Sequence, residues 1–252
     1  YPDEMKENLA MIDKLGSPDT YNHYPTGWAA AFSTPFKMFK RYSGYSGGTA
    51  DPLVIFWPKG IKAKGELRHQ YHHSTDIVPT ILDVAGVAMP DTVNGVKQAP
   101  LAGVSMRYSF DNATSPTTKH TQYYEMIGTR GIWHDGWKAV TNHGPLPSNL
   151  GHYDQDRWEL YHTDEDRSEA VNVAAKYPEK VKKLAALWLE EAKVNNVLPL
   201  IDISVPAIHA LEYKAPVPAD GKYTYYPGTT EIPEASAAPT LGRSFQFTAN
   251  VE

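Results

Sequence analysis

The sequence predicts a mixed α/β fold, in which part of a parallel sheet and its helix precede a small antiparallel sheet with one long helix. Three observations predict this fold. Residues 53–57 form a continuous apolar run that ends at Pro58, as expected of a strand buried on both faces. Residues 75–85 carry the end signals of a helix. Short strand-like segments between residues 121 and 161 are followed by an amphipathic helix over 178–194.

The first 35 residues predict one helix and one ordered loop. Residues 2–15 place Met5, Leu9 and Ile12 on one face, at the spacing of an amphipathic helix. Residues 17–35 have no clear period, so we expect an ordered loop there. Loops of this kind often rim a site, although a packed surface loop is the commoner outcome.

The helix over 75–85 has recognisable residues at both ends. Asp76 or Thr75 can cap its start, because a side-chain oxygen there accepts a bond from a free backbone N–H. Pro79 falls in the first turn, where its missing N–H costs little. Gly86 supplies the left-handed residue that commonly follows a helix.

The second half of the chain predicts an antiparallel sheet with one helix. His134–Asp135–Gly136–Trp137 is a tight-turn signal between two apolar segments. The predicted strands are residues 121–126, 131–134, 137–140 and 158–161. The buried stripe predicted for helix 178–194 consists of Val181, Leu184 or Ala185, Trp188 and Ala192.

Three segments help to divide the chain into predicted domains. Residues 87–118 are irregular, residues 213–242 form an extended proline-rich linker, and residues 243–251 alternate as a strand does. The predicted domains are 1–118, a portion of an α/β domain; 119–198, the antiparallel sheet with its long helix; and 199–252, the linker and the first strand of a further β domain.

Bulk composition excludes several classes of partner. The net charge of −5 argues against nucleic acid, which favours a basic surface. No apolar run approaches the ~20 residues that a membrane span requires. The chain has no cysteine, so disulfides play no part and the compartment stays open, with a periplasmic or secreted location favoured over a cytoplasmic one.

Several short motifs occur in a fixed order over roughly residues 20 to 195. The principal ones are Phe36-x-x-Phe39–Lys40, Gly47–Gly48, Trp57–Pro58 and the segment from Thr75 to Gly86. Supporting matches are Asn94–Gly95, Gly103–Val104–Ser105, Trp158–Glu159–Leu160–Tyr161, Asp166 and Asn172–Val173–Ala174. The ordered set resembles the C-terminal half of a bacterial type I (formylglycine-dependent) arylsulfatase of the alkaline phosphatase-like superfamily. The resemblance implies a partial sulfatase fold, in which residues 1–118 contain the C-terminal part of the central sheet.

The resemblance also implies the chemistry of the complete enzyme, which hydrolyses sulfate monoesters of aryl alcohols or sugars. In that family a formylglycine attacks sulfur and Ca²⁺ polarises the sulfuryl oxygens. This chain lacks the Cys/Ser-x-Pro-x-Arg segment that supplies formylglycine. In the family, an Asp–Asn pair that helps to hold the cation precedes the active-site lysine, whereas the one such pair here, Asp111–Asn112, follows the segment 36–40. We therefore expect a fragment that is inactive alone, binds no metal itself, and has the N-terminal portion of the same enzyme and a small sulfate ester as partners.

Lys40 is the predicted catalytic residue. The family's active-site lysine lies shortly before a Gly–Gly pair, and Lys40 is seven positions ahead of Gly47. A fixed ammonium beside the sulfuryl oxygens stabilises the charge of the transition state. Lys37 and Arg41 compete for this role, and a surface lysine is the ordinary alternative.

Other polar residues admit two interpretations each. His23 and Trp28 could rim a pocket for the leaving group and bind substrate, or Trp28 could simply anchor its loop. The residues His69, His72 and His73 have a spacing that permits zinc, but packing or hydrogen bonding is the stronger expectation.

Two other functions stay open. The first is a phosphonate or phosphodiester hydrolase of the same superfamily, which would differ in residues outside this chain. The second is a non-catalytic carbohydrate-binding or structural module, which the missing nucleophile would suit.

Overall fold

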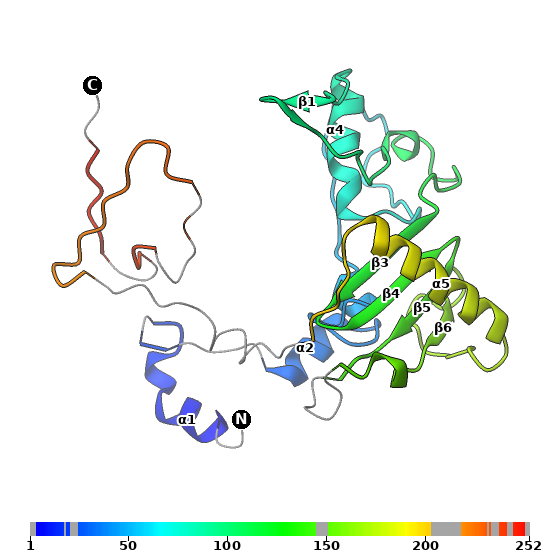
Figure 1. Cartoon of the computed structure of the whole chain (residues 1–252), viewed down its shortest axis with the longest axis horizontal. Coiled ribbons are helices and arrows are strands. Elements are labelled where there is room, and N and C mark those ends of the chain that lie inside the picture. Colours follow the sequence, from blue (N-terminus) through cyan, green and yellow to red (C-terminus); the bar gives the residue numbers. More distant parts are fainter. Residues whose placement is uncertain are drawn as a thin grey trace. The chain divides into compact units, whose positions relative to one another are not determined.

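A computed structural model of the chain describes residues 4–17, 19–20, 25–144, 151–202, 218–230, 232, 237–240 and 244–249 (Figure 1). The chain forms two compact units. One unit consists of residues 30–202 and carries the antiparallel sheet. The other combines residues 1–29 with residues 203–252.

A four-stranded antiparallel sheet forms the centre of the larger unit, with its strands in the order of the sequence. Its strands are β3 (Thr121–Met126), β4 (Thr129–His134), β5 (Trp137–Thr141) and β6 (Glu159–His162). Two turns of the same kind join the first three strands. Ile127–Gly128 has φ values of 50° and 82°, and Asp135–Gly136 has values of 44° and 81°. Positive φ at both positions suits tight hairpins, so the predicted turn at 134–137 is confirmed.

Helix α5 (Pro178–Val194) covers one face of this sheet and builds the main core (Figure 1). The register aligns Ile132, Ala139 and Leu160 in one row across the strands. Leu184, Trp188 and Ala192 of α5 pack against that row. The predicted bounds and buried stripe of this helix are confirmed, because a 3.6-residue period and a proline at the first position specify both locally.

A second helical segment follows the long loop after residue 49. It begins with the 3₁₀ turn η2 (Ser74–Asp76) and continues as α4 (Ile77–Ala85). Gly86 ends it with φ 66°, and the N–H of Val87 bonds to the carbonyl of Leu82 at 2.9 Å. The predicted helix and its glycine end are thus confirmed.

The strand predicted over residues 53–57 is wrong for the described structure. The segment is extended, but no backbone hydrogen bond from residues 53–56 occurs within the described part of the chain. Val54 and Phe56 are 89% and 87% exposed. A strand needs a neighbouring strand to pair with, and the described residues place none beside this run.

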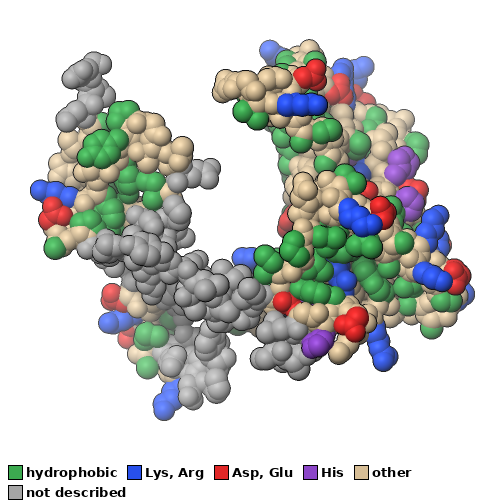
Figure 2. Space-filling view, in the orientation of Figure 1, with side chains coloured by type: hydrophobic (Ala, Val, Ile, Leu, Met, Phe, Trp, Pro, Cys, Tyr) green, Lys and Arg blue, Asp and Glu red, His purple; other side chains and the backbone are tan. Residues whose placement is uncertain are grey.

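Hydrophobic side chains also reach the surface near α4 (Figure 2). An apolar cleft of about 270 Å³ lies between that helix and the unpaired segment. Its lining consists of Leu53, Val54, Ile55, Phe56, Trp57, Ile77, Thr80, Ile81, Val84, Met106 and Phe110.

Short elements also replace two of the predicted irregular regions. Helix α2 (Thr26–Ser33) lies within the predicted loop 17–35, because its alanines favour a helix and the N–H of Ala29 bonds to the carbonyl of Pro25 at 2.9 Å. Strands β1 (Thr92–Val93) and β2 (Val96–Lys97) form a hairpin inside 87–118, with positive φ in the turn between them. The short helices α3 (Ser46–Thr49), η3 (Arg107–Ser109) and η5 (Tyr153–Gln155) complete the larger unit.

The other unit contains little regular structure within its described residues. Helix α1 (Glu4–Ala10) and the 3₁₀ turn η1 (Ile12–Lys14) replace the longer helix predicted over 2–15. The described parts of the linker 213–242 contain neither helix nor strand, and the rest of it lies outside the described residues. Residues 244–249 show no strand pairing, so the strand predicted over 243–251 is not found there; its ends are not described. Among the described helices, none combines the length and apolarity needed to span a membrane.

Candidate functional site

The lysine loop, residues 36–49, lies on the sheet face opposite α5. Tyr45 anchors it, since this side chain is 1% exposed and packs against Val140 and Tyr161. Gly44 brings the backbone close to the sheet, where a Cβ atom would stand 2.5 Å from the Val140 side chain. A side chain at this position would push the loop away from the strands.

The Gly47–Gly48 pair lets the lysine loop close on itself. The N–H of Gly47 donates to the carbonyl of Lys37 at 3.0 Å. A Cβ atom at Gly47 would overlap that same carbonyl, and one at Gly48 would stand 2.5 Å from the carbonyl oxygen of Tyr42. The glycine pair is therefore a requirement of loop closure.

Lys37 holds the first part of the loop on the sheet. Its ammonium donates to Glu159 Oε2 at 3.1 Å and to the Tyr161 hydroxyl at 2.8 Å. It also lies 5.1 Å from the centre of the Tyr45 ring, within cation–π range. Burial and then the neighbouring Glu159 carboxylate raise the pKa of both tyrosine hydroxyls well above their usual value. Lys37 thus has both an ion-pair partner and a hydrogen-bond partner on the sheet.

Ser46, at the start of α3, holds the second part of the loop. The carboxylate of Glu169 accepts from the Ser46 N–H at 2.9 Å and from its hydroxyl at 2.8 Å. The same carboxylate lies 2.8 Å from the ammonium of Lys138 on β5. Burial lowers the pKa of Lys138, while the Glu169 charge opposes that shift. A buried ion pair is therefore part of the loop's attachment.

Lys40 lies between these two attachments and is exposed. Among the described residues it has no ion-pair or hydrogen-bond partner, whereas the competing Arg41 lies 6.0 Å from the ring of Tyr42. The loop therefore presents an ammonium that no described residue pairs with, from a backbone fixed on both sides. Its role in catalysis stays a prediction.

The two predicted substrate-binding residues lie elsewhere in the chain. Trp28 is on α2, is 59% exposed, and has an interaction partner. His23 lies outside the described residues. Neither role is tested, and both stay predictions.

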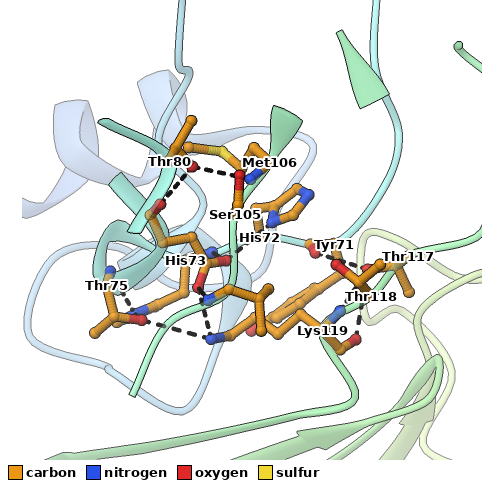
Figure 3. Close-up of polar contacts among 12 residues, drawn as sticks. Tyr71, His72, His73, Thr75, Thr80, Ser105, Met106, Thr117, Thr118 and Lys119 are labelled. Atoms are coloured by element: carbon orange, nitrogen blue, oxygen red, sulfur yellow. Dashed lines mark hydrogen bonds and ion pairs between the residues drawn. The ribbon is translucent and has the colours of Figure 1, made fainter. Parts of the chain in front are cut away.

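Asp76, the last residue of η2, is the centre of a second polar cluster. Its partners His72, His73 and Lys119 are labelled in Figure 3. Its carboxylate is fully buried, and the ammonium of Lys119 lies 2.9 Å away. It also accepts from the ring Nδ1 of His72 at 2.9 Å and from the N–H groups of His73 and Val104, each at 3.0 Å. The predicted N-cap role of Asp76 is wrong, because its side chain makes no cap bond to α4. His73 is instead the N-cap of η2, and Asp76 is the third residue of a capping box, which accepts from the His73 N–H.

The histidine group has structural partners. Besides Asp76, His72 contacts the Tyr108 hydroxyl through Nε2 at 2.9 Å. The ring of His73 accepts from the N–H of Thr75, and His69 is exposed. Hydrogen bonding is thus the role seen for His72 and His73. No group of three His, Asp or Glu side chains within the described residues is placed to hold a metal ion.

The sequence analysis missed several buried charged residues, among them Lys119, Lys138 and Glu169. The ion-pair partner of each lies at least 31 positions away in the sequence, which is the separation of Lys138 and Glu169. No local pattern reveals such a pairing. The alternation of strand 137–140 offered one weak signal, since it assigns Lys138 to the same face as Val140.

Comparison with known proteins identifies a family. The family model described as "N-sulphoglucosamine sulphohydrolase, C-terminal" matches residues 36–194. This segment contains the lysine loop, the Asp76 cluster, the sheet and α5.

Similar sequences carry sulfatase names. An uncharacterized sulfatase of Schizosaccharomyces pombe is 26% identical over 71% of this chain and 31% of its own length. Arylsulfatase K of Xenopus laevis is 26% identical over 59% of this chain and 27% of its own. N-acetylglucosamine-6-O-sulfatase of Bacteroides thetaiotaomicron is 27% identical over 73% and 32%. The matched region thus spans about a third of the length of these relatives.

Solved structures show partial likeness. One, in complex with its substrate D-glucosamine-2-N,6-O-disulfate, is 25% identical, with a TM-score of 0.41, over 58% of this chain and 28% of that one. The crystal structure of Ps i-CgsB is 20% identical, with a TM-score of 0.46, over 69% and 36%. Because both scores are below 0.5, family membership depends on the sequence match.

Proposed function

Because the chain belongs to the family of the N-sulphoglucosamine sulphohydrolase C-terminal region, we propose that the complete protein hydrolyses sulfate esters. The observation that carries this proposal is the family match over residues 36–194. The sulfatase names of the three relatives support it. The match spans only about a third of those relatives, so the activity belongs to a protein in which this chain is one part.

Lys40 is the residue of this chain that we assign to catalysis. Sulfate-ester hydrolysis keeps negative charge on the sulfuryl oxygens and develops more on the leaving oxygen. A lysine without another partner can place its ammonium beside those oxygens, and a loop fixed on both sides limits the reorganisation that this requires. Lys37 does not suit this role, because Glu159 and Tyr161 already occupy its ammonium.

The Ca²⁺ of the proposed reaction does not fit the described residues, and its formylglycine does not fit the sequence. The sequence lacks the Cys/Ser-x-Pro-x-Arg segment, and the described residues include no group of three side chains that could hold an ion. We propose that the N-terminal portion of the same protein supplies both. The chain by itself is then inert, and robust turnover of nitrophenyl sulfate by residues 1–252 alone would contradict this.

The proposed substrate is a small sulfate monoester, either an aryl sulfate or a sulfated sugar. The names of the family and of the Bacteroides relative concern glucosamine derivatives, and the Xenopus relative is named as an arylsulfatase. Turnover of nitrophenyl sulfate, a glucosamine 6-sulfate and a nitrophenyl phosphodiester by the complete protein separates these substrates. Faster hydrolysis of the phosphodiester would overturn the sulfatase proposal.

Substituting Lys40→Ala in the complete protein tests the residue assignment. We expect kcat/KM for the sulfate ester to fall at least about tenfold, or ~1.4 kcal/mol of transition-state stabilisation. Lys64→Ala is the matched control, because Lys64 is also exposed and without a side-chain partner among the described residues. A loss below tenfold for Lys40→Ala, or an equal loss for the control, would remove Lys40 from the site.

A further inference from the structure

Glu169 connects the lysine loop to a distant part of the chain. It follows β6 in the sequence and is 0% exposed. Its carboxylate binds both the N–H and the hydroxyl of Ser46, at 2.9 and 2.8 Å. These two hydrogen bonds restrict the rotation of Ser46 as well as its position, so the start of α3 is held in one orientation.

The charge that makes these bonds is costly to bury. Glu169 and Lys138 lie 2.8 Å apart, with side chains only 0% and 4% exposed. A buried ion pair often contributes little net stability, because the loss of hydration offsets the attraction. The Lys138 ammonium also bonds to the Ser46 hydroxyl at 3.2 Å. Both partners of the ion pair therefore converge on the same residue of the lysine loop.

The backbone at Glu169 is also unusual. Its φ is 59°, a left-handed conformation that residues with a Cβ atom rarely adopt. The turn that produces it is fixed by the Asp166 carboxylate, which accepts from the N–H groups of Ala170 and Val171 at 3.0 and 2.8 Å. Strain of this kind persists where the surroundings dictate the conformation, and it is concentrated at functional sites.

A short covalent path leads from Ser46 to Lys40. Ser46 precedes Gly47, whose N–H closes the loop onto the Lys37 carbonyl at 3.0 Å. Lys40 lies inside this closed segment, and the N–H of Tyr42 bonds to the carbonyl of Phe39 around it at 3.1 Å. Displacing Ser46 therefore alters the closure on which the Lys40 backbone depends.

We propose that Glu169, with Lys138, is a positioning residue that fixes the Lys40 ammonium where the sulfuryl oxygens of the substrate lie. Neither buried side chain touches the substrate; both act through Ser46. The inference rests on the proposed function, because it requires Lys40 to contact the sulfate.

A double-mutant cycle in the complete protein tests this role. Glu169→Gln keeps the size of the side chain and removes its charge. In the native background we expect kcat for a sulfate ester to fall about tenfold, with KM within about twofold. In the Lys40→Ala background the same change should lower kcat by less than about twofold, because the ammonium that it positions has gone.

Each outcome of the cycle has one meaning. If Glu169→Gln lowers kcat by the same factor in both backgrounds, Glu169 supports the fold alone and the inference is wrong. A Glu169→Gln variant with native kcat would also refute it. If Lys40→Ala itself has little effect, the assignment of Lys40 fails along with the inference, whereas sulfate-ester turnover by the complete protein still supports the proposed reaction. A large Lys40→Ala effect without coupling overturns the inference and leaves the proposed function in place.

Two further variants protect the test from a failure to fold. Ser46→Ala removes only the hydroxyl that contacts both Glu169 and Lys138. We expect kcat to fall about threefold, and this fall should also disappear in the Lys40→Ala background. Asp76→Asn is the matched control: its carboxylate is equally buried, also lies near an ammonium, and makes no contact with residues 36–49 among the described contacts. Any effect of Asp76→Asn should be the same in both backgrounds, and coupling there would show that the cycle reports stability.

Discussion

Replacing Asp76 by asparagine should destabilise the larger unit strongly. The substitution keeps the shape of the side chain but removes the charge that faces Lys119. The Lys119 side chain is 3% exposed, so its ammonium would be left buried without a counter-charge. The new amide group would also direct N–H bonds at neighbours that are donors themselves, such as the N–H of Val104.

The size of the effect follows from the burial of the pair. Removing one partner of a buried ion pair costs about 3–5 kcal/mol, because the remaining charge has lost its hydration and gains nothing. Asparagine still offers one oxygen to these donors, so we expect about 3 kcal/mol, at the lower end of that range.

Urea unfolding monitored by tryptophan fluorescence measures this loss. The midpoint should fall while the slope m stays the same, because the surface exposed on unfolding is unchanged. Asp83→Asn is the control: its ion pair with Arg107, at 3.0 Å, is 40% and 55% exposed, and it should lose only a small part of that stability. The double variant Asp76→Asn/Lys119→Met should recover part of the loss, since no buried charge then lacks a partner.

Acid should remove the same stabilisation in the native protein. Burial by itself would raise the pKa of the Asp76 carboxyl. Hydrogen bonds from His72, the His73 N–H, Lys119 and the Val104 N–H outweigh burial and hold this pKa well below its usual 3.8. A depressed folded-state pKa contributes stability above the unfolded pKa and loses it as pH falls toward the folded value. Stability should therefore decline from about pH 5 downward, and less steeply in Asp76→Asn.

Two results would refute the reasoning. One is a loss below about 1 kcal/mol for Asp76→Asn, which would mean that Lys119 finds water or another partner. The other is an unchanged acid profile in the variant, which would assign the pH dependence to other carboxylates.

Two further substitutions test the packing of the core and the close contact between Gly103 and Thr75. Trp188→Ala should cost about 3–5 kcal/mol, because Trp188 is 3% exposed and donates to the Tyr124 carbonyl at 3.0 Å, whereas Leu189→Ala, at 41% exposure, should cost much less. A loss in urea unfolding no greater than that of the Leu189 control would place Trp188 outside the core. Gly103→Ala should lower the melting temperature, because its Cβ atom would overlap the Thr75 carbonyl, and Gly27→Ala, with open space around its Cβ, should raise it slightly through helix propensity. Equal shifts for the two glycines would contradict the close packing at Gly103.

The antiparallel sheet and α5 were predictable because their signals are local. An apolar period, a proline at the first helical position and a glycine in a hairpin turn each restrict the chain without reference to distant residues. Trp188, for example, follows from the spacing within 178–194 alone, and the structure confirms its burial. The end of α4 at Gly86 is explained in the same way.

The buried charges of the candidate site were not predictable, because their partners are remote. Lys138 appears in the sequence as one polar residue in an alternating strand, and such a residue usually faces solvent. Only the folded chain brings Glu169 to it, at 2.8 Å. The attachment of Lys37 to Glu159 depends likewise on residues 122 positions apart. The prediction for Lys40 came from its spacing to a glycine pair, whose role in closing the loop the structure explains.

The strand predicted over 53–57 shows a different limit. Its apolar residues do adopt an extended backbone, but they are neither paired nor buried among the described residues. Pairing, however, depends on neighbouring strands, and one segment cannot specify those. Helix α2 was missed for the opposite reason, because no hydrophobic period distinguishes its alanine-rich sequence from a loop.

The uncovered segment at residues 53–56 has a practical consequence for work with this chain. Four neighbouring β-prone side chains, each at least 42% exposed, offer a template on which a second molecule can add its own strand. The rate of such association grows with the square of the protein concentration, so we expect concentrated stocks to aggregate during storage. We expect light scattering to detect association that rises with concentration, and a charged residue introduced at Val54 to reduce it.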